Sequence, residues 1–438
     1  MTRPLLACAL ALGAVTPVRA QQAPRTLTLG GAARLATELS APATLARYRA
    51  READGRAREA RAALLPSAHA SFADGQRTFN TASFGLPLPG FDAHGEIIGP
   101  VRTVDVRGRV TATLLDPAAR GRLGGARAAA VAADADAASV AEQTAVAAAL
   151  AYVRALRATA HLAARASDSS LAAGLLRIAQ DQLQAGVGVA LDVTRASTQL
   201  SAVRAQLIVA RNEVDRAHLD LLRSVGLPLD AQVALADSLA PLDADQHTTL
   251  PSAIEHARRE RQDVLAARAA LDAARRNARA ARAERLPTVG VFGDDGVTSN
   301  SYPYLLGTWA WGIQVSVPLF DGFRSGARAE QRDAATRQAE ARLHDLEQQA
   351  EADVRGAYFD VASSREQLDA AVERLRLAEL EVAQARDRFS AGVSGNADVI
   401  AAQLGLNGAR SLYVDALAAQ HTARIALARS QGRVTALP

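Results

Sequence analysis

The sequence has a single cysteine and no lysine. Cys8 is the only cysteine in 438 residues and lies in a stretch that we expect to be removed on export, so the mature chain has no disulfide and no cysteine metal ligand. All 50 basic residues are arginines, against 46 acidic residues. Because charge is nearly balanced and no basic patch stands out, the sequence argues against nucleic-acid binding.

Long hydrophobic runs are also missing. After residue 20 no stretch is apolar for about 18 residues, so the sequence predicts no membrane-spanning helix. Residues 1–20 carry Arg3, a short apolar stretch and the ending Val18-Arg19-Ala20, which is typical of a secretory signal peptide cleaved after Ala20. If the mature protein meets a membrane, it must do so with strands.

Motifs for catalysis or metal binding are absent too. The eight histidines are scattered, with no pair at metal-ligand spacing, and there is neither a Gly-x-Ser-x-Gly motif nor a phosphate-binding loop. The sequence therefore predicts no enzyme, no metal site and no cofactor.

What the chain does contain is a second copy of part of itself. Residues 151–226 align without a gap on residues 357–432 at an offset of 206, so that Tyr152 falls on Tyr358. The run 185–187 (Ala-Gly-Val) falls on 391–393, and 192–193 (Asp-Val) falls on 398–399. A period this long exceeds that of solenoid repeats and indicates one duplicated unit. We expect a first repeat over 21–226, a linker over 227–250 and a second repeat over 251–438.

Each repeat has the same expected order of elements: a helix, two strands, a very long helix, a glycine turn and a returning helix. In the second repeat we expect the first helix over 252–285, ending before Pro287, because the residue before proline is disfavoured in a helix. Strands are expected over about 68–79 and 103–115, and over about 288–298 and 308–320. The last of these alternates strictly, with Trp309, Trp311, Ile313, Val315, Val317 and Leu319 on one face.

The long helices, expected over 117–185 and 322–391, carry heptad patterns. Leu368, Leu375, Val382 and Phe389 follow one another at intervals of seven, which favours helices packed side by side in a supercoil. The helices of an ordinary soluble bundle remain an alternative.

The strands allow two interpretations. A soluble sheet packed on a core would also alternate, but the heptads already commit the helices to one another. Tyr302, Tyr304, Trp309 and Trp311 also cluster at one end of the strands, as the aromatic belt of a membrane barrel does. Four strands are too few to close a barrel, so several chains must share one, and a water-filled interior favours three or more.

The combination of these features resembles the TolC-like outer-membrane efflux family. The resemblance rests on Leu65-Pro66 and Leu286-Pro287 before the strands, residues 317–322 after them, and the two glycine turns. It implies a mainly α fold with a transmembrane β-barrel contribution: a homotrimer with a twelve-stranded barrel continuous with a twelve-helix tunnel, and the linker in a belt around the tunnel. It also implies a passive exit duct in the outer membrane of a Gram-negative-type cell, extending into the periplasm. A periplasmic adaptor and an inner-membrane pump would be its partners.

The two glycine turns are the candidate functional sites. Gly186 and Gly392 are expected to adopt positive φ and end the long helices, while Asp192 and Asp398 start the returning helices as caps or first-turn acids. The resemblance implies a second role, in which these acids form the pore gate and Asp398 supplies a ring of charge. The family's second acid, one turn later, is replaced here by Ala401.

The same turns suggest a docking surface. By the resemblance, the adaptor would dock on Gly186, Val187, Gly188, Gly392, Val393 and Ser394, although packing between neighbouring turns would also account for small and apolar residues there. One departure from the family is the run 261–263, Arg-Gln-Asp, where proline is usual in the middle; we expect little effect on function.

The main rival hypothesis is a periplasmic adaptor protein, which also combines an exported helical hairpin with strands. Adaptors contain a single hairpin, so the duplication favours the channel. The sequence leaves the cargo open among drugs, metal ions and polypeptides.

Overall fold

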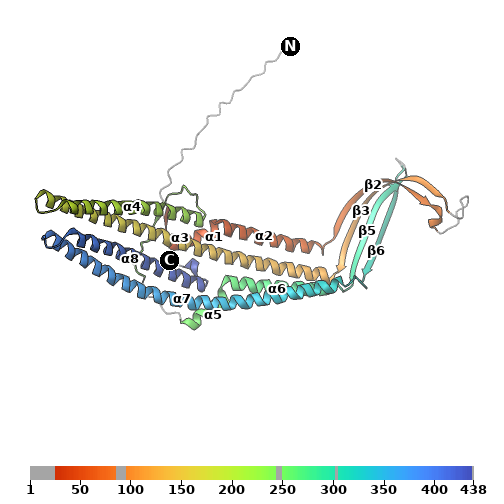
Figure 1. Cartoon of the computed structure of the whole chain (residues 1–438). Coiled ribbons are helices and arrows are strands. Elements are labelled where there is room, and N and C mark those ends of the chain that lie inside the picture. Colours follow the sequence, from red (N-terminus) through yellow and green to blue (C-terminus); the bar gives the residue numbers. More distant parts are fainter. Residues whose placement is uncertain (1–24, 85–94, 243–248, 301–303, 437–438) are drawn as a thin grey trace, which may run out of the picture.

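The computed structural model describes residues 25–84, 95–242, 249–300 and 304–436. The expected signal peptide and Tyr302 lie outside these ranges. The helices form an elongated body, with a β-sheet at one end and the two turns that join the long helices to their partners at the other (Figure 1). None of the helices in the described ranges is both long and apolar enough to cross a membrane.

The order of elements is the same in both halves of the chain. The first half contains α1 (Leu29–Leu39), α2 (Ala41–Ala62), β2 (Ser67–Asn80), β3 (Ile97–Leu115), α3 (Pro117–Gln184) and α4 (Ala190–Val225). The second contains α5 (Leu250–Glu260), α6 (Gln262–Ala283), β5 (Thr288–Ser299), β6 (Leu306–Ser316), α7 (Arg324–Ser390) and α8 (Asn396–Ser430). Short elements complete the chain: β1 (Arg25–Leu27), β4 (Val233–Leu235) and the 3₁₀ turns η1 (Thr81–Phe84) and η2 (Val434–Ala436).

The prediction of a single helix over 252–285 is wrong. The backbone is extended at Arg261 (φ −61°, ψ 128°), which separates α5 from α6. The buried Arg261 side chain pairs with Asp263 at 2.7 Å and with Asp353 of α7 at 2.8 Å. Side chains two residues apart do not face each other on a continuous helix, so the break allows the first of these pairs. Ser40 makes the equivalent break between α1 and α2, with φ −62° and ψ 144°.

Two strand boundaries also differ from expectation. β6 ends at Ser316 instead of 320, close to Pro318, which has no N–H for the ladder. β3 begins at Ile97 instead of 103, because Val101 pairs with Arg77 of β2 and, beyond a bulge in β2, Ile97 and Ile98 pair with its last two residues.

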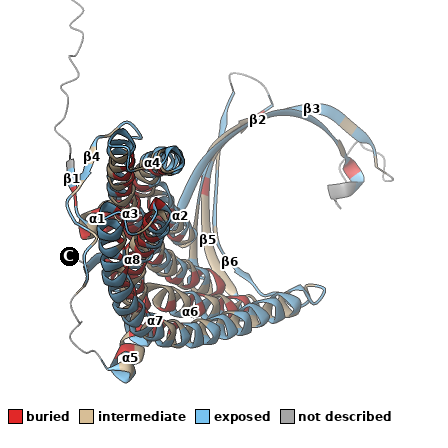
Figure 2. Cartoon of the chain, turned by 60° about the vertical axis from the view of Figure 1, so that its left-hand side comes forward, coloured by how far each residue is buried: buried red, intermediate tan, exposed pale blue. Residues whose placement is uncertain are grey.

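The four longer strands form one antiparallel sheet in the order β2-β3-β5-β6. The sheet arches away from the helices, and much of it is exposed (Figure 2). β2 and β6 are its edges, with no further strand beside either one in the described ranges. Within the described part of one chain, two rows of backbone hydrogen-bonding groups are therefore left without strand partners.

The two faces of this sheet differ in chemistry. Trp309, Trp311 and Ile313 lie on one face and are 72%, 72% and 66% exposed, and Phe72 shares that face from the other edge. The opposite face carries a polar cluster in which Asp294 pairs with Arg107 and Arg109, Arg107 also pairs with Asp105, and Arg107 donates to Thr308 at 2.9 Å. So large an exposed apolar surface is unusual for a monomeric soluble protein and indicates contact with lipid or protein.

The long helices lie side by side in a ribbon. Toward the turns, α3 packs between α4 and α8, and α8 packs between α3 and α7; toward the sheet, α3 packs between α2 and α6, and α6 packs against α7. The predicted heptad is partly visible here, since Leu368, Val382 and Phe389 are buried. The ribbon therefore has two lateral edges: α2 and α4 on one side, and α7 on the other.

A second heptad ladder, which is ionic, joins α6 to α7. Arg268, Arg275 and Arg282 on α6 follow one another at intervals of seven, and they pair with Glu347, Glu340 and Asp333 on α7 at 2.7–2.8 Å. Exposed pairs of this kind stabilise a fold weakly, by about 0–1 kcal/mol each. Their main effect is to favour one register between the antiparallel helices.

The segment after α4 is packed onto one face of α3. Tyr152 of α3 is fully buried; its hydroxyl donates to the carbonyl of Leu27 at 2.8 Å and accepts from the amide of Asp237 at 3.2 Å. Burial raises the pKa of Tyr152 to about 12. β1 and β4 pair in parallel beside it, so the start of the first repeat and the linker that follows it are held on the Tyr152 face of the ribbon.

Candidate functional site

The two turns at the end remote from the sheet have the same backbone geometry. Gly186 and Gly392 adopt φ of 74° and 71°, which confirms the predicted left-handed conformation. The amide of Val187 donates to the carbonyl of Gln182 at 3.0 Å, and that of Val393 to Arg388 at 2.9 Å. These 6→1 bonds belong to the Schellman motif, which ends a helix at a residue with positive φ.

The turns expose apolar side chains. Val187 is 80% exposed and Val393 69%, while Gly188 and Ser394 are half-buried. Gly188 is confined, because a Cβ there would lie 2.9 Å from the backbone of Gln182. Val189 and Leu191 are also exposed beside Val187. Sequence reasoning missed these two, although they follow the glycine turn directly, so the apolar tip is larger on the α4 side.

The two aspartates are first-turn acids and not caps. Val189 is the N-cap of α4 and Gly395 that of α8, with Asp192 and Asp398 in the first turn of each helix. This placement complements the helix dipole. Their surroundings differ. The Asp192 side chain is 16% exposed and lies 3.9 Å from Arg195, whereas Asp398 is exposed and, in the described ranges, pairs with no cation.

Hydrogen bonds and apolar contacts join one turn to the other. Asn396 Nδ2 of α8 donates to the backbone carbonyl of Asp192 at 2.7 Å, and Gln182 Nε2 of α3 donates to that of Phe389 at 3.3 Å. Asn396 is fully buried. Beneath them Leu175, Ala179, Ala196, Phe389 and Val399 form a shared apolar cluster. Sequence reasoning missed this link, although Asn396 falls on Ala190 in the repeat alignment and so marks a place where the copies differ.

A polar seam runs between α3 and α8 farther from the turns. Arg157 Nε donates to Asp415 at 2.7 Å, and His161 Nε2 lies 3.0 Å from the same carboxylate. Burial favours a higher pKa for Asp415, but the hydrogen bonds from Arg157 and His161 outweigh it and hold the pKa below its ordinary value. Deeper in the seam, the fully buried Asp168 carboxylate pairs with Arg165 at 3.1 Å and Arg410 at 2.7 Å.

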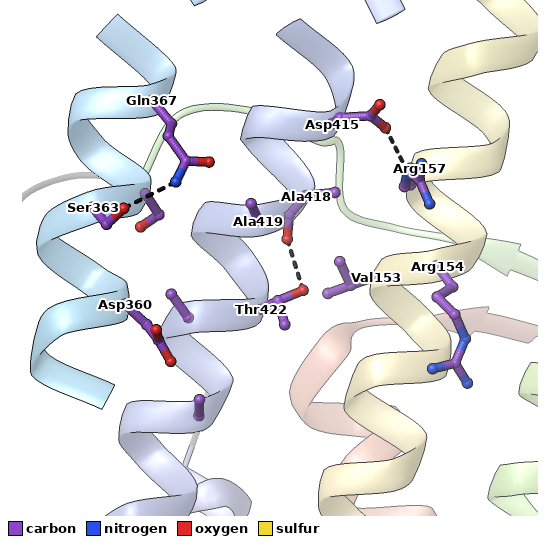
Figure 3. Close-up of a pocket in the computed structure, with 13 residues that line it drawn as sticks. Val153, Arg154, Arg157, Asp360, Ser363, Gln367, Asp415, Ala418, Ala419 and Thr422 are labelled. Carbon is purple, nitrogen blue, oxygen red and sulfur yellow. Dashed lines mark hydrogen bonds and ion pairs between the residues drawn. The ribbon is translucent and has the colours of Figure 1, made fainter. Parts of the chain in front are cut away.

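The seam borders two grooves on one face of the ribbon. The first lies over α8, between the Arg154 and Arg157 side of α3 and the Asp360 and Gln367 side of α7 (Figure 3). Ala418 and Ala419 form part of its floor. Arg154 is two residues from Tyr152, a rotation of about 200° on a helix. The grooves therefore lie opposite the face that carries β1, β4 and the segment around Asp237.

A partly buried carboxyl group lies where α3 meets the break at Arg261. Glu142 Oε1 is buried and has no hydrogen-bond partner in the described part of the chain. Burial, with a further contribution from the nearby Asp263, raises the pKa of Glu142, although Arg261 and Arg429 act in the opposite direction. Sequence reasoning gave no signal for this residue, because its charged neighbours come from two distant segments, the break at Arg261 and the end of α8.

Three of the four residues of the expected aromatic belt lie in the described ranges. Tyr304, Trp309 and Trp311 are 72–75% exposed, and Trp309 and Trp311 share one face of β6. Their role at a membrane stays a prediction. In the described ranges no group of three histidine, cysteine, aspartate or glutamate side chains is arranged to hold a metal ion.

Known proteins match both the sequence and the fold. Residues 253–433 match the model of the outer membrane efflux protein family. Alkaline protease secretion protein AprF of Pseudomonas aeruginosa is 31% identical over 244 residues, which cover 52% of this chain and 48% of AprF. Outer membrane efflux protein BepC of Brucella suis is 26% identical over 266 residues, covering 60% of this chain and 57% of BepC. The chain thus spans about half the length of these curated relatives.

The fold matches over a larger share of the chain. The solved structure of the outer membrane protein VceC from Vibrio cholerae superimposes with a TM-score of 0.77 at 18% identity, covering 92% of this chain and 96% of VceC. At that identity the likeness shows a shared fold, and it extends over both repeats.

Proposed function

This chain belongs to the TolC-like family of outer-membrane efflux proteins, and on that premise we propose that it is the outer-membrane channel of a tripartite efflux or secretion system. In this role it is a passive exit duct for cargo that an inner-membrane pump delivers through a periplasmic adaptor. The names of its relatives include both efflux and protease secretion, so the proposal covers channels of both kinds of system. The adaptor hypothesis is disfavoured, because the fold shared with the outer membrane protein VceC covers 92% of the chain.

The observation that carries this proposal is the open-edged sheet. Among the residues that the structure describes, its edge strands β2 and β6 have no further strand partner, and Trp309 and Trp311 are exposed on one face. Within a lipid bilayer such edges are tolerated only if another strand pairs with them. Three copies would supply twelve strands, enough for a barrel with a water-filled interior. The apolar face then meets lipid, and the face with Arg107 and Asp294 lines the barrel.

The helical ribbon would close in the same way, with α7 of one copy beside α2 and α4 of the next. The Tyr152 face must then point outward. Otherwise each of the three copies would place β1, β4 and the segment around Asp237 inside the tunnel and obstruct it. This orientation agrees with the belt implied for the linker. The opposite face, with the two grooves, becomes the tunnel wall.

The tips supply the gate and the docking surface in this proposal. The bonds from Asn396 and Gln182 hold the two turns of each copy together, and the exposed Asp398 of three copies forms a ring that favours cations. Asp192 belongs to the same region but is partly covered. The adaptor would contact Gly186, Val187, Gly188, Gly392, Val393 and Ser394, of which Val187 and Val393 offer the largest apolar area.

Membrane fractionation and channel recording test the proposal together. The full-length chain is expressed in a Gram-negative cell that lacks its own channel of this class. We expect the protein in the outer membrane fraction after an alkaline wash, released only by detergent, as a trimer that conducts ions in planar bilayers. A monomer that is released without detergent would contradict the proposal.

A further inference from the structure

A second groove lies on the face that we assign to the tunnel wall, between α3 and α4. Its volume is ≈ 650 Å³, which suits an organic molecule of drug size. Ala158, Ala205 and Val209 give it apolar walls, while Arg154, Arg157 and Gln206 bring polar groups to the same space. This combination of apolar surface and a few polar groups is typical of sites for small organic molecules.

The arginines of this groove differ in how far they are already engaged. Arg165 donates to Asp168 and Ser411. Arg157 donates to Asp415 through Nε, which leaves its two terminal nitrogens free of protein hydrogen bonds in the described ranges. Arg154 is exposed and forms no ion pair in the part of the chain that the structure describes. Two guanidinium groups, three residues apart on one helix, are therefore available to a ligand.

Acidic groups near the groove reduce the positive charge that these arginines offer to a ligand. Glu213 of α4 also lines it and pairs with neither arginine within 4 Å in the described ranges. Asp415 is shared between Arg157 and His161, and Asp168 is enclosed by Arg165 and Arg410. The unsatisfied positive charge of the groove is thus concentrated at Arg154, with Glu213 as the nearby group that weakens it.

We propose that this groove is a weak binding site for amphipathic organic anions on the tunnel wall, which we call the station. The apolar body of the molecule lies against Ala158, Ala205 and Val209, and its acidic group accepts hydrogen bonds from Arg154 and the terminal nitrogens of Arg157. Guanidinium groups bind carboxylate and sulfonate oxygens through charge-assisted bonds. The groove is open, so binding is weak enough for cargo to leave, as conduction requires.

The inference rests on the proposed function, since the groove faces cargo only if it lines a tunnel. It adds a class of cargo and two residues that contact it, far from the acidic tips. The station and the tips have opposite charge, so a cation and an anion passing through the duct would be held at different places.

Blocking of single channels tests the station. Purified trimers of the full-length chain are inserted in planar bilayers, and 8-anilinonaphthalene-1-sulfonate is titrated from the side of the tips. We expect Arg154→Gln to raise the half-blocking concentration about tenfold, the loss expected for one charge-assisted hydrogen bond. Glu213→Gln should act in the opposite direction and lower it. Block by the cation tetraphenylphosphonium should not weaken in Arg154→Gln.

Arg34→Gln is the matched control, because it removes the same charge from the exposed surface of α1, on the other face of the ribbon. Equal block in wild type and Arg154→Gln overturns the station, as does an equal loss in Arg34→Gln, which would indicate a general effect of charge. A wild-type protein that forms no channel contradicts the proposed function itself, so the two failures are distinguishable.

Discussion

The side-chain amide of Asn396 donates a 2.7 Å hydrogen bond to the backbone carbonyl of Asp192. This bond joins the first turn of α8 to the first turn of α4, two segments from different repeats. Because Asn396 is fully buried, the bond is shielded from competing water. It is a direct link between the two halves of the duplicated chain at the end where the duct is expected to close.

Removing that link should loosen the tips, which form the gate in our proposal. In Asn396→Ala we expect more frequent and larger openings in planar bilayers, because the two turns lose a buried hydrogen bond worth about 1 kcal/mol. Cells that carry the variant should also become more sensitive to a large polar antibiotic that the outer membrane normally excludes. Thr194→Ala, on the exposed surface of α4, removes only the bond from the Thr194 hydroxyl to the carbonyl of Ala190 in its own helix and should behave as wild type. Unchanged openings in Asn396→Ala would exclude this bond from the gate.

Asp398 and Asp192 should differ in their effect on ion selectivity. Asp398 is exposed and Asp192 is partly covered beside Arg195, so a charge lost at 398 is the one that permeating ions would sense. We expect Asp398→Asn to reduce cation selectivity, measured as a shift of the reversal potential in a salt gradient, and Asp192→Asn to change it less. A larger shift in Asp192→Asn would reverse the assignment.

A charge placed on the apolar tip should disrupt export without disrupting assembly. Val393 is exposed in the turn, so Val393→Asp leaves the packing of the chain intact but makes adaptor contact unfavourable, because the carboxylate would be buried there. We expect loss of cargo export with normal trimer yield on gels and by cross-linking. Val131→Asp, at an exposed position of α3, which lies inside the ribbon and not at its lateral edges, is the comparison. Normal export by Val393→Asp would argue against docking at the tips.

The pH dependence of stability should reveal Glu142. Burial raises its pKa in the folded protein above the ordinary 4.5, so the folded state binds the proton more tightly than the unfolded state. Stability from this group is therefore complete below pH 4.5 and declines as pH rises through the folded pKa. Glu142→Gln mimics the protonated form, and we expect it to raise the Tm of the trimer by about 2 °C at pH 8.

The gain should shrink toward zero near pH 4, where Glu142 is protonated in both states. Glu366→Gln, on α7 and outside the Glu142 cluster, serves as the reference for the loss of one negative charge. A gain in Glu142→Gln that is the same at pH 4 and pH 8 would mean that the effect is one of packing and not of protonation.

The repeated unit and the alternating strands could be predicted from the sequence, because both depend on local sequence pattern. The glycine turns, the long helices and the four strands follow from positive-φ positions, the positions of prolines and alternation with a period of two. The break at Arg261 was not predictable in this way. It accompanies an ion pair with Asp353, about ninety residues away in the chain, and no local signal marks an extended residue between Glu260 and Gln262.

The residues of the candidate site also fall into those that a local pattern predicts and those that it does not. Gly186, Gly392 and the first-turn acids were visible as motifs, whereas Gln182, Asn396, Glu142 and the seam from Arg157 to Asp415 depend on which helices become neighbours. A polar residue on a long alanine-rich helix has the same local pattern whether it meets water or another helix. Only the packing of α8 against α3 gives Asp415 and Arg157 their partners.

The edges of β2 and β6, which have no strand partner in the described ranges, have a genetic consequence in the proposed trimer. There each subunit would accept a strand from one neighbour and offer a strand to the other, so one faulty subunit would break the closed ring for all three. A variant damaged only at one of these strands would still be recruited and would spoil complexes that contain healthy subunits. Such an allele should therefore be dominant over the wild-type gene when both are expressed in the same cell.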